Sequence, residues 1–469
     1  MPESPASAFR AFLDYRNVGR LCLTLLLTLS IVLSHFLLSG HNHQRVLQLA
    51  VLASASAIMV ARGSISLPQG LLRLLLLLFF MLGALSAALS FSPRHAVAEV
   101  SLLLLLLLLA LAAAREMAAD FPAALAQVLT LLALGGALYL AQVIVPWAGA
   151  IVEHAQLDPT SLAPSFSNFR LFNHAQTVGL PLFVLLCCRQ GPAYKKSRFV
   201  LTACWWALLI SLGGRGSLVG LLAGSVGALI LRGRHAIPFC KMMLATAFGG
   251  LLVYAVFFVC IPLAAGLEPF GLLTHMAGRT AHDPASSRVE LWLPALHMME
   301  AAPWLGIGPA HFAHLMVASI AAHPHNWMLQ FGAEWGVPAL LCLCAMVALG
   351  MRSLAGSAAR LAAADTVNQT LLAAWIATGI AIVVDGLVSG NIVMPVSQLM
   401  IALYLACARG WLLSLAPAAS ATPGPRLAVR AVVLVAAIGL LWYVATDVRQ
   451  TTRPYGELAH PRFWLDGHF

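Results

Sequence analysis

The chain has 469 residues, of which 61% are hydrophobic and only 9% are charged, and this composition excludes a soluble globular protein. Its formal net charge is +10, from 27 Lys and Arg against 17 Asp and Glu. Several apolar runs reach the roughly 20 residues needed to cross a bilayer, and in lipid such runs must be helices because each backbone polar group has to be satisfied within its own segment.

The first apolar run follows a polar stretch of 20 residues, is too long for the core of a signal peptide and lacks a persuasive cleavage site, so we interpret it as a retained span. Hydropathy predicts an all-α polytopic membrane protein with about 12–13 transmembrane helices in a single domain, residues 1–469. The predicted spans are 19–39, 46–61, 71–90, 96–114, 122–147, 174–188, 199–213, 217–231, 239–265, 325–350, 367–387, 392–411 and 427–446.

The distribution of Lys and Arg predicts the orientation of these spans. With the N-terminus inside, 18 of the 27 Lys and Arg fall in cytoplasmic loops, which is the positive-inside bias. Two loops of interest, 148–173 and 267–324, then lie outside, which in a bacterial cell is the periplasm. The net charge therefore indicates membrane topology and attraction to anionic lipid, not a nucleic-acid-binding surface.

The loop 267–324 is the longest polar interruption between spans, and we expect it to contain short helices. The spacing Ser287-x-x-Glu290 is that of a capping box, so a helix is predicted from Arg288 to about Ala301. A turn over residues 303–309 should end it. The loop and its end are rich in cationic and titratable side chains: Arg279, Arg288, His275, His282, His297, His311, His314, His323 and His325.

Arginines on the outer face are informative because membrane topology disfavours them there. Arg170 is predicted just before the sixth span, Arg215 lies in a glycine-rich turn between two spans, and Arg288 opens the loop helix. The planar guanidinium matches phosphate oxygens, so three near one membrane face suit a lipid-linked pyrophosphate. For each arginine alone, contact with a lipid headgroup or a loop salt bridge is the alternative, and it is less favoured for Arg215, which has glycine neighbours and almost no exposed carboxylate nearby.

His325 is predicted in the first turn of the tenth span, where the positive end of the helix dipole disfavours an imidazolium. A neutral imidazole there could accept a proton from a sugar hydroxyl, and Asn326 could orient it or hold a substrate. The alternative is an interfacial histidine satisfied by water.

The sequence predicts no metal ion and no cofactor. His323 and His325 lack the spacing of a metal site, and carboxylates in the outer loops are few. No nucleotide-binding glycine loop occurs.

Two carboxylates inside the predicted spans, Glu334 and Asp385, are candidates for functional groups or for polar contacts between helices. The nine cysteines fall within spans or at their edges, so no disulfide framework or thiolate metal site is predicted.

The order of motifs resembles the O-antigen ligase family of bacterial envelope enzymes, by motif over about residues 165–345 and by topology over the whole chain. The motifs are Arg215-Gly-Ser, then Arg288-x-x-x-Trp292, Pro303-x-x-Gly306-x-Gly308, and His325-Asn326-x-x-Leu329-Gln330 continuing to Glu334-x-Gly336. One departure is Ala339, where the family pattern prefers Gly, Thr or Tyr.

The resemblance implies a fold similar to the C-type glycosyltransferases and a metal-independent, inverting transfer of polysaccharide from undecaprenyl pyrophosphate to lipid A–core. It places the enzyme in the inner membrane with the active site facing the periplasm, in contact with membrane lipids, without nucleic acid and as a monomer. His325, Arg288 and Arg215 then correspond to the family's catalytic residues. Arg170, Asn326 and His323 are expected to bind substrate.

Three alternatives remain open. An O-antigen polymerase shares the superfamily, and so does a protein O-oligosaccharyltransferase, which the short polar tail argues against. A transporter for an anionic solute would use Glu334, Asp385 and the arginines as a pathway, but it predicts an internal repeat that the sequence does not show.

Overall fold

The computed structural model describes residues 21–36, 40–62, 65, 67–189, 195–270, 288–315, 321–416, 426–447 and 462–465, and within these residues it contains helices and no strand. The chain is therefore an all-α, multi-pass membrane protein, as predicted. Ten described stretches are long and apolar enough to span a bilayer, and a shorter apolar helix covers Cys22–His35.

The first half of the bundle consists of α3 (Cys22–Phe36), α4 (His41–Arg62), α5 (Leu71–Leu89), α6 (Pro93–Ala118), α7 (Phe121–Val152), α8 (Phe169–Cys188), α9 (Lys195–Ser211) and α10 (Arg215–Arg232). A 3-10 turn, η1 (Pro159–Leu162), lies between α7 and α8. The second loop of interest is thus shorter than the predicted 148–173, because both flanking helices extend into it. Arg170 consequently lies in the first turn of α8, not ahead of it.

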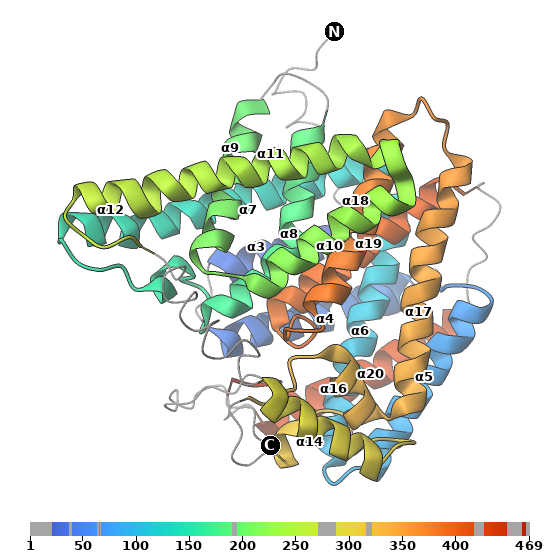
Figure 1. The fold of residues 1–469 in the computed structure, drawn as a ribbon. Coiled ribbons are helices and arrows are strands. Elements are labelled where there is room, and N and C mark those ends of the chain that lie inside the picture. The colour runs from blue at the N-terminus through green and yellow to red at the C-terminus, as the bar shows by residue number, and fades with distance from the viewer. Residues whose placement is uncertain are drawn as a thin grey trace.

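The chain turns back at η2 (Gly233–Ala236) into α11 (Ile237–Tyr254), a π-helical stretch η3 (Ala255–Cys260) and α12 (Ile261–Ala264) (Figure 1). The remaining elements are α14 (Arg288–Ala301), α15 (Phe312–Leu315), α16 (Trp327–Trp335), α17 (Val337–Gly356), η4 (Ser357–Arg360), α18 (Thr366–Asp385), α19 (Pro395–Ser414) and α20 (Arg426–Asp447). The stretch Arg215–Ala264 contains two helices, α10 and α11. When these are counted separately and the shorter α3 and α9 are included, a helix lies at each of the predicted spans.

The predicted tenth span, 325–350, is wrong in one respect: it is two helices, α16 and α17, separated at Gly336. Gly336 has φ +87°, and a Cβ there would lie 2.3 Å from the carbonyl oxygen of Trp304. Only glycine tolerates that backbone conformation and that approach, so the apolar run cannot continue as one helix.

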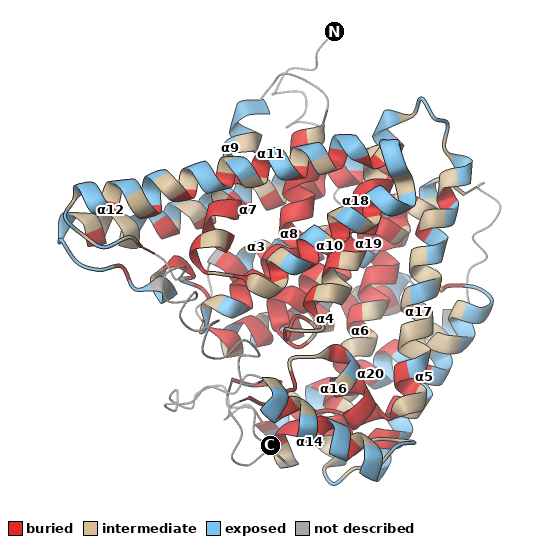
Figure 2. Cartoon of the chain, viewed as in Figure 1, coloured by how far each residue is buried: buried red, intermediate tan, exposed pale blue. Residues whose placement is uncertain are grey.

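Burial is greatest in the centre of the bundle, where almost every side chain of α8 is buried, while α11 and α17 expose apolar side chains on their outer faces (Figure 2). A second apolar cluster joins α5, α6, α16 and α17 through Phe79, Phe331 and Trp335. Polar residues of α8, α10 and α18 meet where Thr177 binds Asp385 and Ser217 binds the backbone of Asn173. The candidate site lies beside them.

The tightest helix pair is α10 against α18, and it depends on a glycine seam at Gly216, Gly220 and Gly224. These residues are four apart and lie on one face of α10. A Cβ would lie 2.7 Å from Ala381 O at Gly220 and 2.2 Å from Ala377 O at Gly224. Small residues at this spacing let two membrane helices approach closely.

Candidate functional site

The turn that contains His325 is held between α14 and α16, which lie together at one end of the molecule (Figure 1). Helix α14 runs from Arg288 to Ala301, as the sequence predicts, although Ser287 of the predicted capping box lies outside the described residues. The indole Nε1 of Trp292 donates a hydrogen bond of 3.0 Å to the carbonyl oxygen of Pro324. The motif Arg288-x-x-x-Trp292 therefore connects an arginine to the histidine turn.

The predicted turn after α14 is present, and its backbone forms hydrogen bonds with the C-terminal end of α16. The backbone N–H of Ile307 donates to Ala333 O at 2.9 Å, and that of Gly308 donates to Glu334 O at 3.0 Å. Gly306 has φ +69°, and a Cβ on it would lie 2.4 Å from the carbonyl carbon of Glu334. The glycines of this motif thus position α16 and bring no reactive group of their own.

His325 precedes α16 and is not in the first turn of a span, which corrects the expectation from the sequence. Asn326 is the N-cap: its Oδ1 accepts hydrogen bonds from the N–H groups of Met328 and Leu329 at 2.9 and 3.2 Å. His325 has φ +51°, an uncommon conformation for a residue with a Cβ. Such strain is typical of functional sites, where the surroundings hold it.

Two predicted arginines lie within electrostatic range of His325. Burial, then the positive charges of Arg288 and Arg170, lower the pKa of His325 to about 4. The same two arginines and His325 act on the buried His174 of α8. A neutral imidazole is therefore favoured for a reason other than the helix dipole expected from the sequence: burial lowers the pKa of His325 most, and the positive charges of Arg288 and Arg170 lower it further.

His323 lies directly behind His325, with the two ring centroids 4.1 Å apart. Its Nδ1 accepts a hydrogen bond from the N–H of His325 at 3.3 Å, and burial keeps its pKa well below the usual range. A Cβ on Gly390 would lie 2.4 Å from the His323 ring, so the loop after α18 packs against it.

Arg215 is the first residue of α10 and directly follows the turn that joins α9 to α10. A Cβ on Gly214 would lie 2.9 Å from Asn173 Cγ, and one on Gly216 would lie 2.7 Å from Asp385 Oδ1. The turn that carries Arg215 therefore rests directly on polar residues of α8 and α18. Its side chain is half-buried.

Asp385 is the functional candidate to which the sequence alone assigned no role. It lies at the end of α18, fully buried, and its Oδ2 accepts hydrogen bonds from Thr177 Oγ1 at 3.0 Å and Asn391 Nδ2 at 3.4 Å. Arg288 also acts on it electrostatically. Its position as a carboxylate in an apolar span was the available signal; His174 and Asn391 gave none.

Four buried atoms around Asp385 have no hydrogen-bond partner within the described part of the chain: Asn173 Oδ1, His174 Nδ1, Asp385 Oδ1 and Asn391 Oδ1. Oxygen atoms of this kind accept hydrogen bonds, and an imidazole nitrogen can do so in one tautomer. We call these four residues the acceptor group. These atoms are buried within the bundle, so they are polar groups of the interior beneath the site, whereas the guanidinium groups suit an anion.

Among the residues that the structure describes, no three His, Cys, Asp or Glu side chains come together as possible ligands of a metal ion.

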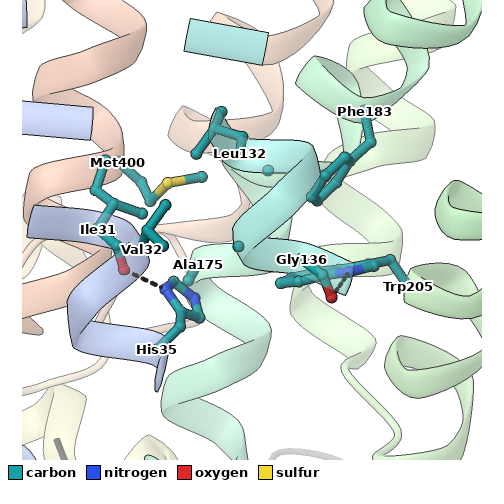
Figure 3. Close-up of a pocket in the computed structure, with 11 residues that line it drawn as sticks. Ile31, Val32, His35, Leu132, Gly136, Ala175, Phe183, Trp205 and Met400 are labelled. Carbon is teal, nitrogen blue, oxygen red and sulfur yellow. Dashed lines mark hydrogen bonds between the residues drawn. The ribbon is translucent and has the colours of Figure 1, made fainter. Parts of the chain in front are cut away.

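A small cavity between α3, α7, α8, α9 and α19 is a separate feature (Figure 3). It is lined mainly by apolar side chains, and its His35 is bound to Ile31 O at 2.7 Å. Because no charged group lines it, it does not carry the chemistry.

Comparison with known families agrees with this arrangement. Residues 199–344 match the family model described as O-antigen ligase. This part of the chain is similar to O-antigen ligases, which supports the O-antigen ligase/polymerase superfamily. The matched residues include Arg215, Arg288 and His325, whereas Arg170, His174 and Asp385 come from helices outside them. No curated protein sequence matches the chain significantly.

Proposed function

We propose that the protein is an O-antigen ligase of the bacterial inner membrane, which transfers a polysaccharide from undecaprenyl pyrophosphate to a sugar of lipid A–core at the periplasmic face. The observation that carries the proposal is the buried His325 turn, with φ +51° at His325 and with Pro324 O held by Trp292 of α14, in a chain whose residues 199–344 match the O-antigen ligase family model. The positive charges of Arg288 and Arg170 act on this histidine and add to the burial that lowers its pKa.

In the proposed reaction the arginines hold the donor pyrophosphate and stabilise the charge that develops on it as a leaving group. His325 accepts the proton of the acceptor hydroxyl, whose oxygen attacks the anomeric carbon of the donor sugar. The new glycosidic bond forms as the bond from that carbon to the pyrophosphate oxygen breaks. The anomeric centre is inverted, and undecaprenyl pyrophosphate leaves.

The guanidinium groups and the hydrogen-bond acceptors support separate roles in binding the donor and the acceptor. A pyrophosphate offers only acceptor oxygens at neutral pH, so it matches guanidinium donors and not the acceptor group. A sugar hydroxyl can donate its proton to the neutral imidazole of His325, whose burial lowers its pKa. Breaking the sugar–phosphate bond supplies the driving force, so neither ATP nor a metal ion has a step in this scheme.

The test is transfer in vitro between purified lipid-linked glycan and purified lipid A–core, followed by gel analysis of the glycolipid. A ladder of polysaccharide on core supports the proposal. In a deletion strain, unattached polymer should accumulate on the carrier lipid. Single repeat units on core would instead indicate an O-antigen polymerase, and transfer to a protein would indicate an oligosaccharyltransferase.

A further inference from the structure

A four-residue segment late in the chain, Arg462–Leu465, is buried among helices far from it in sequence; we call it the anchor segment. Arg45 of α4 donates from Nε to Phe463 O at 2.9 Å and from Nη2 to Arg462 O at 3.1 Å. The N–H of Leu465 donates to Asn42 Oδ1 at 2.7 Å. Helix α4 thus presents side chains that bind the backbone of this segment specifically.

The Arg462 guanidinium lies between two carboxylates on different helices. Its Nη2 is 2.5 Å from Glu334 Oε2 of α16 and 3.3 Å from Glu99 Oε1 of α6. With the Gln330 amide turned so that its oxygen faces the guanidinium, Arg462 also donates to it at 2.9 and 3.1 Å. The three charged side chains are at most 7% exposed. Burial removes the hydration of each charge, and the attraction between the guanidinium and the two carboxylates offsets that cost.

This ion cluster is directly connected to the histidine turn. Glu334 and Gln330 belong to α16, a helix of nine residues whose N-cap, Asn326, follows His325 in the chain. The other oxygen of Glu334, Oε1, accepts from the N–H of Phe312 at 2.9 Å, which ties the same carboxylate to the loop. A shift of Glu334 would therefore move the whole short helix and the turn at its start.

We infer that Arg462 is a positioning residue for the transfer reaction. By holding Glu334 and Gln330 it fixes α16, and through α16 it fixes the direction in which His325 faces the acceptor hydroxyl. The inference deepens the proposed function and rests on it. Arg462 acts through another element, because its guanidinium is enclosed by Glu99, Glu334 and Gln330.

The experiment compares purified wild-type protein with Arg462→Gln in the in vitro transfer assay, with kcat and the donor KM measured separately. A misplaced base lowers kcat, so we expect a fall of about tenfold or more. The donor KM should change by less than about threefold, because the donor-binding arginines are untouched. Arg462→Lys keeps one charge but loses the planar fork, so it should fold and still show the lower kcat.

Rescue distinguishes positioning from simple loss of structure. In the double variant R462Q/E334Q the buried carboxylate of Glu334 becomes a neutral amide that can pair with Gln at 462. We expect kcat to recover part of the loss, which gives a non-additive double-mutant cycle. A double variant as slow as the product of both single effects would contradict the coupling.

Trp464→Phe is the matched control in the same segment, because it removes the bond from Nε1 to Asp447 Oδ2, 3.2 Å long, and part of a fully buried side chain, while all side chains of the ion cluster remain. We expect its kcat to stay within about twofold of the wild type. Wild-type kcat in Arg462→Lys, or equal losses of kcat in the tryptophan and arginine variants, would overturn the inference. Absence of transfer by the wild-type protein would instead refute the proposed function itself.

Discussion

At the scale of single residues, the site depends on how the charges around one imidazole are arranged. His325 is kept neutral by burial and by Arg288 and Arg170. Other histidines of the same loop have structural contacts. Both nitrogens of His311 are engaged, with Nε2 accepting from the N–H of Ser92 and Nδ1 bound to Pro309 O, and His314 stacks on Phe91 at 4.6 Å. The position of a histidine in this loop therefore does not single out a base; the proposal of His325 rests on its burial and on the neighbouring positive charges.

Replacing His325 by Ala should lower transfer by at least about 10²-fold, the usual contribution of a general base, without lowering the amount of protein in the membrane. His314→Ala is the control, because it removes a ring that packs on Phe91 away from the arginines. The measurement is initial rate per mole of purified enzyme. Normal turnover by the His325 variant would show that another group takes the proton.

The acid limb of the pH–rate profile should report the pKa of His325. A general base must be unprotonated, so a pKa lowered to about 4 leaves kcat/KM flat through neutral pH and reduces it only as the pH falls toward that value. Replacing Arg170 by Gln removes a positive charge that disfavours the imidazolium. Its acid limb should therefore move to higher pH. An unchanged or lower midpoint would mean that Arg170 does not act on His325.

At the scale of elements, two close helix contacts set the geometry. The glycine seam brings α10, which begins at Arg215, against α18, and the break at Gly336 lets α16 lie with α14 rather than continue α17. In both cases a missing Cβ decides where a neighbouring backbone can go. The positions of the arginines and of the histidine turn are consequences of these contacts.

Gly220→Ala and Gly224→Ala should lower the thermal stability of the purified protein and its transfer rate together, because each new Cβ meets a carbonyl oxygen of α18. Overpacking of this kind costs about 1–3 kcal/mol. The control is Gly350→Ala in α17, where a Cβ would meet nothing within 4 Å. Both properties can be measured by thermal unfolding in detergent and by the transfer assay. Wild-type behaviour of both seam variants would show that α10 adapts without cost.

At the scale of the whole molecule, the site is assembled from one end of several antiparallel helices: the start of α8, the turn before α10, the end of α18, and the α14–α16 unit. The positive-inside bias predicts that this end faces the periplasm. The donor pyrophosphate and the acceptor core sugar would then approach from the same side of the membrane.

The predicted orientation can be tested by thiol labelling of intact cells in a cysteine-free background. Glu153→Cys, exposed after α7, should react with a membrane-impermeant maleimide, whereas Arg234→Cys, exposed in η2, should react only after the cells are opened. The reverse pattern would place the site in the cytoplasm and would exclude the proposed acceptor.

Transfer should continue in EDTA, because the proposed steps use guanidinium and imidazole groups for charge and proton transfer. The measurement is the initial rate of detergent-extracted enzyme before and after chelation. Loss of activity that a divalent ion restores would contradict a metal-independent mechanism.

How much the sequence could predict depended on how local each feature is. The all-helical membrane fold, most of the helices and α14 follow from runs and spacings within a few turns, and these predictions were correct. The division at Gly336 was missed because a glycine in an apolar run has no distinctive local signal until Trp304 is known to approach it. The roles of Asp385 and Arg462 depend on partners in other elements, such as Thr177 and Glu99, and no local pattern contains them.

The anchor segment also has a consequence for biosynthesis. Arg462 is separated from Glu99 by 363 residues and from Glu334 by 128, so during translation both carboxylates are made long before their cation. Until residue 462 has been synthesised and has reached the bundle, the two acids lack the guanidinium of Arg462, and α16 lacks this contact during membrane insertion. Ribosome stalling before residue 462, or proteolysis that removes the anchor segment, should therefore give a membrane-inserted protein with the same loss of transfer rate as the Arg462→Gln variant.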